Sequence, residues 1–335
     1  MIQFTGARRF QAALILSIVL LAALCILHIS VGTVQLTPAQ VIASLLNRPV
    51  EPYDRIIVWD LRLPRTLIAL ASGAMLGLSG AILQFIMRNP LAEPDMTGAT
   101  SGAVLGAVLW LASASGGTGD PGVLVPWVAL LGGLVAGIAI YAASGGPAGG
   151  PTRLIMTGLL ISIMLRSVTS MVLVIQQQAV GSAIGWLIGS LNGRVWVHWD
   201  ILWPWAAVTI PLGLMSARWA NALQLGDMTV KGLGVPLGRA RAWLFFVAIA
   251  LTAGAVAIVG GIAFLGLIVP HIARRIVGVD ARRVFPLSVV LGAALMVLAD
   301  IIAQTAIHTV TLPVGAVLAI FGAPFFLYLV QRSRA

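Results

Sequence analysis

The sequence predicts an all-α, polytopic membrane protein with about ten transmembrane helices and with the N- and C-termini in the cytoplasm. Of 335 residues, 59% are hydrophobic and only 9% are charged, and the mean hydropathy is +1.03. Water-soluble globular proteins lie far from this composition. A membrane-spanning helix needs about 20 apolar residues, and such runs recur along the chain. Residues 1–335 are therefore expected to form a single transmembrane domain.

The first predicted span follows Arg8 and Arg9 and covers residues 10–31. Its charge order resembles that of a signal peptide, but the run holds 22 residues and has no small-residue cleavage site before Gln35. A retained helix is the better interpretation. The other predicted spans are residues 66–87, 98–115, 123–143, 154–175, 200–216, 243–259, 261–273, 285–304 and 312–331.

Charged residues sort by the side of the membrane. With the N-terminus inside, the inner segments hold 14 basic and 4 acidic residues, and the outer segments hold 5 basic and 6 acidic residues. Basic residues favour the cytoplasmic side, so this orientation is predicted. The same distribution explains the net charge of +10 without a nucleic-acid partner, and the bilayer itself is the expected surrounding.

The stretch Trp243–Ala273 has 31 residues, which is long for one span and short for two. One span would place Arg239 and Arg241 on the opposite side from Arg274 and Arg275. Two short spans that turn at residues 260–261 keep both pairs inside, so ten spans are favoured over nine.

The segments between the spans carry further signals. In the outer segment 32–64, Thr37 and Pro38 predict the N-cap and first turn of a short helix that ends at Asn47. Residues 181–199 predict an interfacial helix beside a cluster of tryptophans typical of a membrane boundary. The inner loop 217–241 predicts two short helices joined by a turn, and residues 274–284 form a second inner loop. Glycines spaced four residues apart, at 73, 77, 98, 102 and 106, predict close helix packing.

The motifs of common enzymes are absent from the sequence. It contains no nucleotide-binding loop of the form GxxxxGK[ST], no HExxH and no GxSxG. The single Cys25 and the four histidines lack metal-ligand spacing. The chain is therefore predicted to be neither an enzyme nor a metal protein, and to move or anchor something with energy supplied from elsewhere.

Three features point to function. Arg166 lies near the middle of the fifth span, where an arginine costs roughly 2.5–3.5 kcal/mol and usually faces a cavity or a partner; pairing with a carbonyl or snorkelling outward is the alternative. The loop 217–241 is either a solvated basic loop or a docking surface for a cytoplasmic partner. The turn at residues 89–94 breaks the chain near the inner surface, where non-helical backbone must be buried or line a water-filled cavity.

Several motifs together resemble the FecCD-type permeases, the membrane subunits of ATP-binding-cassette (ABC) importers for iron-siderophores, haem and cobalamin. The resemblance covers essentially the whole chain. It is carried by LRLPR (61–65), GLSGAILQ (77–84), RNPLAEPDMTG (88–98), LGDMTVKGLGV (225–235), GGIAFLGLIVPHIARRIVGVDARR (260–283) and LPVGAVLAIFGAPFF (312–326).

The resemblance implies a ten-helix subunit that pairs with a second permease, as a homodimer or a heterodimer, around a translocation path. A cytoplasmic ATPase dimer that uses ATP and Mg²⁺ would drive transport, and an extracytoplasmic solute-binding protein would deliver the cargo. The chain itself would bind no cofactor. Iron-siderophore uptake, and hence iron transport, across a bacterial cytoplasmic (inner) membrane is the implied process.

The same resemblance implies roles for individual residues. The residues implied to form the gate and pathway are Asn89, Pro90, Leu91 and Thr152. The residues implied to couple the chain to the ATPase are Gly226, Asp227, Lys231 and Gly234. Those of binding-protein docking are Arg62, Arg65 and Gln304, the last standing where cobalamin-type members carry an arginine.

Arg166 has no counterpart in the family pattern, so its role is inferred from the residue itself. Ferric siderophores are commonly anionic, and a cation that faces the pathway would favour them over cobalamin or haem, which remain the alternative cargoes. A different class, an ion-gradient-driven secondary transporter, would need intramembrane acids. The only such candidate is Asp300, near the outer end of the ninth predicted span.

Overall fold

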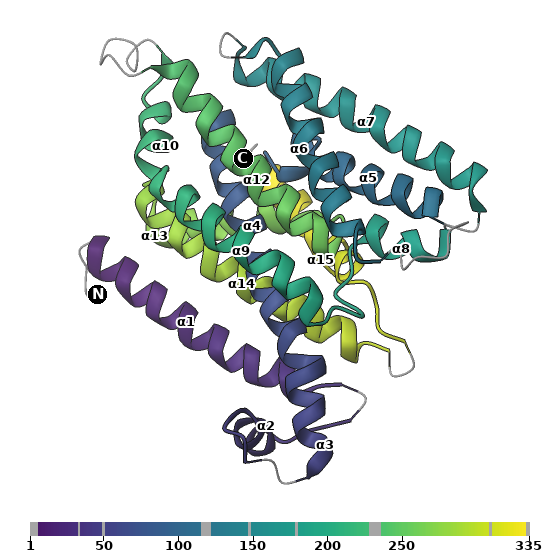
Figure 1. Ribbon diagram of the computed structural model, residues 1–335. Helices are drawn as coiled ribbons and strands as arrows, with labels where there is room; N and C mark the ends of the chain where they lie inside the picture. The colour runs from purple at the N-terminus through teal and green to yellow at the C-terminus, as the bar shows by residue number, and fades with distance from the viewer. Residues whose placement is uncertain are drawn as a thin grey trace.

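The computed structural model describes residues 6–32, 34–48, 51–114, 122–146, 149–177, 180–227, 236–307 and 310–332, and all of its regular elements are helices (Figure 1). Each of the ten predicted spans coincides with a helix. These helices are α1 (Gly6–Ser30), α4 (Leu63–Met87), α5 (Ala99–Ala114), α6 (Val125–Ala143), α7 (Pro151–Ile175), α9 (Trp196–Met215), α12 (Leu237–Val259), α13 (Leu265–Val277), α14 (Ala281–Thr305) and α15 (Val314–Arg332).

Shorter helices fill the connections between the spans. Outside the membrane-length helices lie α2 (Pro38–Leu45), α3 (Pro52–Arg55), a π-helix (Ile56–Arg62), a 3₁₀ turn (Pro94–Thr97), α8 (Val180–Ile188) and α10 (Ala217–Gln224). In α2, the Thr37 side chain accepts a hydrogen bond from the backbone N–H of Gln40, and the Gln40 side chain accepts one from the N–H of Thr37. This capping box confirms the helix start that the sequence predicts.

Helix α4 is the centre of the bundle. It packs against α14, α12, α13 and α9, and every residue from Ser72 to Met87 is buried. A second group, formed by α5, α6 and α7, lies on the other side of α12, while α1 runs along α14 at the opposite edge (Figure 1). The helix that links the two predicted functional ends is thus largely buried.

Glycines allow α4 to approach its neighbours closely. A Cβ atom added at Gly80 would lie 1.9 Å from the carbonyl oxygen of Gly266, and one added at Gly73 would lie 2.5 Å from that of Gly292. Gly102 of α5 similarly faces the carbonyl of Gly132 in α6, at 2.4 Å. The packing role predicted from the four-residue spacing is confirmed at these crossings.

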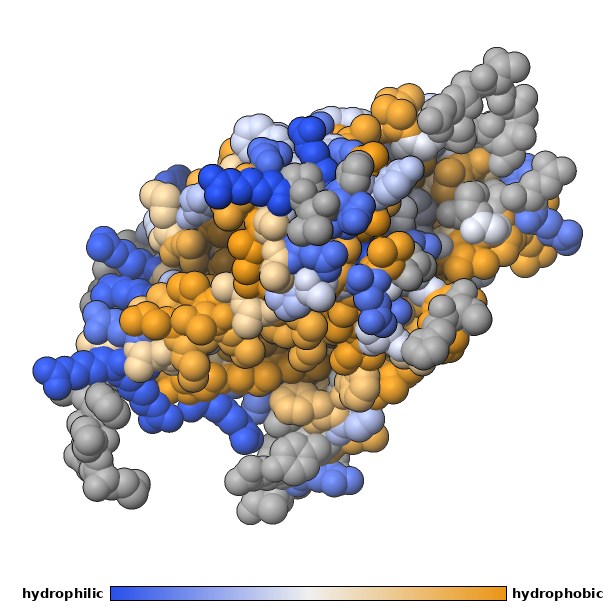
Figure 2. Space-filling model, turned by 90° about the horizontal axis from the view of Figure 1, so that it is seen from below, coloured by the Kyte–Doolittle hydropathy of each residue, from blue (hydrophilic) through white to orange (hydrophobic). Residues whose placement is uncertain are grey.

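The outer side of the bundle is apolar. Within the described residues, six helical segments, including α1, α7 and the continuous Tyr53–Met87, are long and apolar enough to cross a membrane by length and composition. Figure 2 shows broad hydrophobic areas on the face seen there, with hydrophilic groups at its left edge and in a band through its middle. Large side chains such as Leu16, Leu160 and Val174 are 70%, 70% and 72% exposed, which suits contact with lipid rather than water.

Several predicted elements have different bounds in the structure, and α13 and α8 show a physical reason. The helix predicted at 261–273 begins at Leu265 and ends at Val277, because Phe264 adopts a left-handed φ of +66° and Gly278 one of +83°. The interfacial helix predicted over 181–199 ends at Ile188. There Gly189 has φ +79°. A Cβ atom added at Gly189 would lie 2.4 Å from the carbonyl oxygen of Gly261, so a side chain has no room at this position.

Candidate transport pathway and its two ends

An open cavity of about 510 Å³ with both polar and apolar walls lies where α5, α7 and α15 meet the turn before α5. Its polar walls come from Asp95, Thr100, Ser101, Arg166, Thr169 and Ser170, and its apolar walls include Val104, Leu187, Ile262 and Ala316. Polar side chains from separate helices converge here within an otherwise apolar bundle. This cavity is the candidate pathway site.

Arg166 lies on the cavity wall, as its position within the fifth span predicts. Its side chain is 58% exposed and forms an ion pair with Asp95, whose side chain is 22% exposed. The guanidinium Nε also donates to the hydroxyl of Ser101 at 3.3 Å. The guanidinium therefore has one acidic partner while part of its surface remains open to the cavity.

The segment from Arg88 to Gly98, called here the gate turn, connects α4 to α5. Arg88 ends α4 in a left-handed conformation with φ +47°. The Asn89 side-chain oxygen accepts a hydrogen bond from the N–H of Leu91 at 2.9 Å, and Thr97 donates to the carbonyl of Pro94 at 2.6 Å. These local bonds satisfy backbone groups that a non-helical segment would otherwise leave unpaired.

The gate turn is held from two sides. On one side, the Glu93 carboxylate accepts a hydrogen bond from the N–H of Phe264 at 3.2 Å, at the start of α13. On the other side lies α7. A Cβ atom added at Gly158 of α7 would lie 2.0 Å from the carbonyl oxygen of Met96, and the Ser162 hydroxyl donates to the carbonyl of Asp95 at 3.4 Å. The turn thus bridges α7 and α13.

The predicted pathway residues do not all line this cavity. Arg166 does, whereas Asn89 and Leu91 are half-buried in the gate turn, and Pro90 and Thr152 are exposed near its end of the bundle. The structure therefore separates the cavity, which Arg166 and Asp95 line, from residues 89–91 of the gate turn and from the start of α7. Their role as a gate stays a prediction.

At the predicted outer end, Arg65 is bound within the protein. Its guanidinium donates to both oxygens of Asp300, at 2.7 and 2.8 Å, and Asp300 is fully buried. His28 lies 2.7 Å from the same carboxylate and 2.8 Å from the Thr66 hydroxyl, and Gln304 donates to Asp300 at 3.1 Å. This group, called here the Asp300 cluster, joins α1, α4 and α14.

Arg62 is also bound internally. It donates to the carbonyl of Ile29 at 2.6 Å, to that of Ser30 at 3.0 Å and to that of Val34. These bonds fasten the end of α1 and the chain beyond it to the π-helix. Docking of a binding protein on Arg62, Arg65 and Gln304 stays a prediction. Each of these side chains already donates a hydrogen bond to an acceptor within the chain, and docking would have to use the same side chains.

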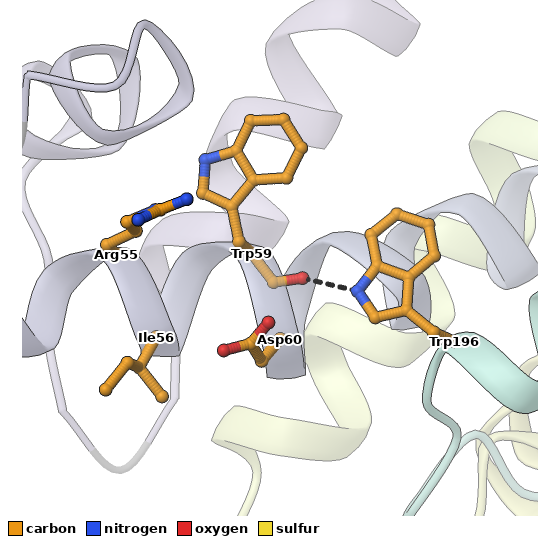
Figure 3. A pocket seen from close by; sticks show the side chains of 5 residues that line it. All are labelled: Arg55, Ile56, Trp59, Asp60 and Trp196. Carbon is orange, nitrogen blue, oxygen red and sulfur yellow. Dashed lines mark hydrogen bonds between the residues drawn. The ribbon is translucent and has the colours of Figure 1, made fainter.

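A second cavity, of about 400 Å³, lies beside the π-helix and is lined by Arg55, Ile56, Trp59, Asp60 and Trp196 (Figure 3). The Trp59 indole donates to the carbonyl of Ser44 at 3.0 Å, and the Trp196 indole donates to that of Trp59 at 2.9 Å. With both indole donors used, the tryptophans fix the outer segment to the start of α9.

At the predicted inner end, Asp227 joins the loop to the bundle. It accepts hydrogen bonds from Arg88 at 2.6 Å and from Arg241 at 3.3 Å, and Arg241 also donates to the carbonyl of Gly149 at 3.1 Å. Burial raises the pKa of the Asp227 carboxyl, but the two arginines outweigh it and leave the pKa below its usual value. Gly226 precedes Asp227 with φ +91°.

The rest of the predicted coupling group, Lys231 and Gly234, lies in residues 228–235, outside the described residues. The neighbouring α10 is described, and it is anchored to both α4 and α14. Gln224 donates to the carbonyl of Phe85 at 2.9 Å, and Asn221 donates to Asp280 at 2.6 Å. Burial of Asp280 is outweighed by this bond and by the N–H of Arg282, so its pKa is lowered.

The described part of the chain contains no group of three or more His, Cys, Asp or Glu residues that could hold a metal ion. Two features of the site were missed by sequence reasoning, namely the pairing of Asp95 with Arg166 and the closed Asp300 cluster. The residue types gave a partial signal, because an intramembrane charge usually has a partner. The identity of each partner depends on contacts between distant parts of the chain: Arg166 and Asp95 are separated by 71 positions, and Arg65 and Asp300 by 235.

The fold and the cavity define the class of protein. Helices long and apolar enough to cross a membrane carry charged and hydroxyl side chains that line one shared cavity, so the fold is that of a multi-pass membrane protein with a candidate pathway site.

Comparison with known proteins identifies the family. The FecCD transport family model matches residues 20–332, and the chain belongs to that family. It is 33% identical over 326 residues to the Fe(3+)-citrate import system permease protein YfmE of Bacillus subtilis, covering 97% of this chain and 96% of that protein. It is 37% identical over 294 residues to the cobalamin import system permease protein BtuC of Halobacterium salinarum, covering 86% and 77% respectively.

A solved structure is also similar. It is the inward-facing conformation of an ABC transporter assigned to the metal-chelate type, with a TM-score of 0.84 and 27% sequence identity over 95% of this chain and 98% of that chain. The expected family, all-helical fold and permease class are therefore confirmed.

Proposed function

We propose that this chain is the membrane subunit of an ABC importer that moves anionic ferric chelates of the siderophore or citrate type into the cytoplasm. The observation that carries the proposal is Arg166, a guanidinium 58% exposed on the wall of an open cavity that also presents hydroxyl groups. Support for the cargo class comes from relatives that are named for ferric citrate, such as the B. subtilis protein and the Fe(3+) dicitrate transport system permease protein FecD of Escherichia coli, 38% identical over 281 residues.

Arg166 sets the charge preference of the pathway in this proposal. A guanidinium offers five N–H donors in a planar fork that suits carboxylates. The hydroxyls of Thr100, Ser101 and Ser170 are further partners on the same wall. Cobalamin and haem are the alternative cargoes, and the similarity to a cobalamin permease favours testing cobalamin beside the ferric chelates.

Uptake by the Arg166→Gln variant tests the cargo proposal. ATP-dependent uptake of ferric citrate and other anionic iron chelates is expected to fall at least tenfold, because a charge-assisted hydrogen bond is lost from a partly desolvated site. Uptake of a neutral iron chelate should change little. Arg153→Gln, an exposed arginine at the start of α7, is the matched control. Unchanged uptake of every anionic chelate by the Arg166 variant would refute this role.

The partners follow from the family. We propose that two permease subunits, identical or different, enclose the path, that a cytoplasmic ATPase dimer consumes ATP and Mg²⁺, and that an extracytoplasmic solute-binding protein delivers the chelate. The presence of paired permeases in one system among the relatives, FecC and FecD of E. coli, supports a permease pair. The outer segment 32–64, with Arg62, Arg65 and Gln304, is the proposed binding-protein side.

The inner loop 217–241 is the proposed contact with the ATPase. Its described part is connected to the gate turn, because Asp227 pairs with Arg88, the residue that ends α4 and begins that turn. A force on the loop would therefore reach the gate turn through one ion pair. Gly226, Asp227, Lys231 and Gly234 are the proposed coupling residues.

Asp227→Ala tests this connection. We expect ATP hydrolysis by the assembled importer to lose at least half of its stimulation by loaded binding protein, while the ATPase still copurifies, because the loop remains but its tie to Arg88 and Arg241 is gone. The readout is the ratio of ATPase rates with and without loaded binding protein. Asp200→Asn, an exposed acid on α9, is the control. Normal stimulation in Asp227→Ala would move the coupling role to the other inner loop, 274–284.

A further inference from the structure

The ion pair between Arg166 and Asp95 joins two parts of the site that the proposed function treats separately. Arg166 belongs to α7 and faces the cavity, whereas Asp95 belongs to the gate turn. Both side chains line the same cavity, so an anion that enters it meets Arg166 already paired with a carboxylate of the protein.

We propose that Asp95 is a specificity-determining residue, an internal carboxylate that occupies Arg166 when the cavity is empty and that an anionic cargo must displace. The proposal rests on the proposed function in its choice of cargo. Chemically, the exchange replaces one carboxylate on the guanidinium by another. Only a cargo with a carboxylate or a similar anionic oxygen can make that exchange without leaving Arg166 unpaired.

The exposure of the two side chains fits this role. Arg166 is 58% exposed and Asp95 is 22% exposed, so the pair is reached from the cavity and is not sealed in the core. Exposed ion pairs contribute about 1 kcal/mol or less. The pair is therefore weak enough for an incoming multivalent anion to replace it.

The Asp300 cluster gives a useful contrast. Asp300 is fully buried and accepts from Arg65 at 2.7 and 2.8 Å, with His28 and Gln304 completing its surroundings. Neither Arg65 nor Asp300 lines the cavity of Arg166 or the cavity beside the π-helix. The same two residue types thus form a closed structural pair at one place and an accessible pair at the other.

Displacement of Asp95 also affects the gate turn. The turn contacts α7 through the Arg166 pair, through the Ser162 hydroxyl on the carbonyl of Asp95 at 3.4 Å, and through the close approach of Gly158 to Met96. Of these three contacts, the ion pair is the one that an anion can compete for. Binding of cargo at Arg166 therefore loosens the gate turn from α7 while the Glu93 contact with α13 remains.

The test is the binding of ferric citrate to the purified permease in nanodiscs, without ATPase or binding protein. Asp95→Asn should bind ferric citrate about fivefold more tightly than the unmodified chain, since a competing ion pair worth roughly 1 kcal/mol is removed. Arg166→Gln should bind at least tenfold more weakly. Asp200→Asn and Arg153→Gln, which change an acid and an arginine outside the cavity, should bind like the unmodified chain.

The opposite signs of the two effects are the decisive point. If Asp95 only held the structure together, its replacement would weaken binding or leave it unchanged, and either result would overturn the proposal. An unmodified chain that does not bind ferric citrate would overturn it as well. Because this measurement needs no transport, a chain that binds in the predicted order but fails to accumulate chelate would refute the proposed function and leave this inference standing.

Hydrogen exchange gives a second readout. Ferric citrate should raise the amide exchange rate of residues 88–98 in the unmodified chain at least threefold. In Asp95→Asn the rate should already be raised without ligand and should change little when ligand is added. Exchange that falls on ligand binding in both chains would contradict the release of the gate turn.

Discussion

Arg65→Glu is expected to destabilise the protein by about 3–5 kcal/mol, the usual effect of breaking a buried ion pair. The substitution would place a second carboxylate against Asp300, which is fully buried and has His28 and Gln304 as its remaining polar neighbours. The measurement is thermal or denaturant unfolding of the purified permease. Arg55→Glu, on the exposed surface of the same outer segment, should change stability by less than about 0.5 kcal/mol.

A double variant separates structure from docking at this position. Arg65→Gln with Asp300→Asn removes both charges together, and it should recover much of the stability that either single change loses. If Arg65 also receives the binding protein, the double variant should fold but associate weakly with it. Equal stability of the Arg65→Glu and Arg55→Glu variants would show that the Asp300 cluster does not stabilise the packing of α1, α4 and α14 at the outer end.

Gly80→Ala is expected to cost about 3 kcal/mol or more, at the upper end of overpacking effects. The added Cβ would lie 1.9 Å from the carbonyl oxygen of Gly266 and 2.5 Å from its Cα, so backbone rather than a flexible side chain would have to move. Gly266 in turn packs against Pro94 of the gate turn: a Cβ atom added at Gly266 would lie 2.5 Å from the Pro94 Cδ. We therefore expect loss of uptake together with loss of stability.

The matched control is Gly185→Ala in α8, where an added Cβ meets nothing within 4 Å. That variant should keep its stability or gain a few tenths of a kcal/mol, because alanine is the better helix former. Yield of folded permease, unfolding temperature and chelate uptake are the readouts. A Gly80→Ala protein as stable as Gly185→Ala would contradict the close contact between α4 and α13.

The helices were predictable because each depends on a long local run of apolar residues, and the charges between runs fix their number. The division of residues 237–277 into α12 and α13 followed from charge alone, although the start of α13 was misplaced. Its position depends on Phe264, a non-glycine residue with φ +66° whose N–H bonds to Glu93. That contact spans 171 positions and leaves no local pattern.

The candidate site was predictable to a similar degree. Arg166 was evident because a charge within an apolar span is rare, but Asp95 lay in a turn where an acid is unremarkable. Arg62 and Arg65 were evident as a pair around Pro64, yet only the fold shows that their donors are taken by backbone carbonyls and by Asp300. Local sequence indicates which residues carry charge, and tertiary contacts decide how that charge is used.

The most direct test of the proposed function is uptake of radioactive ferric citrate into vesicles that contain the permease, its ATPase and its binding protein. We predict that ferric citrate accumulates only when ATP is present on the side of the membrane that carries the ATPase, and that it still accumulates when ion gradients are dissipated. Its uptake should exceed that of cobalamin by at least tenfold. Accumulation that follows an ion gradient without ATP, or uptake of cobalamin in place of every ferric chelate, would contradict the assignment of this chain to anionic ferric chelates.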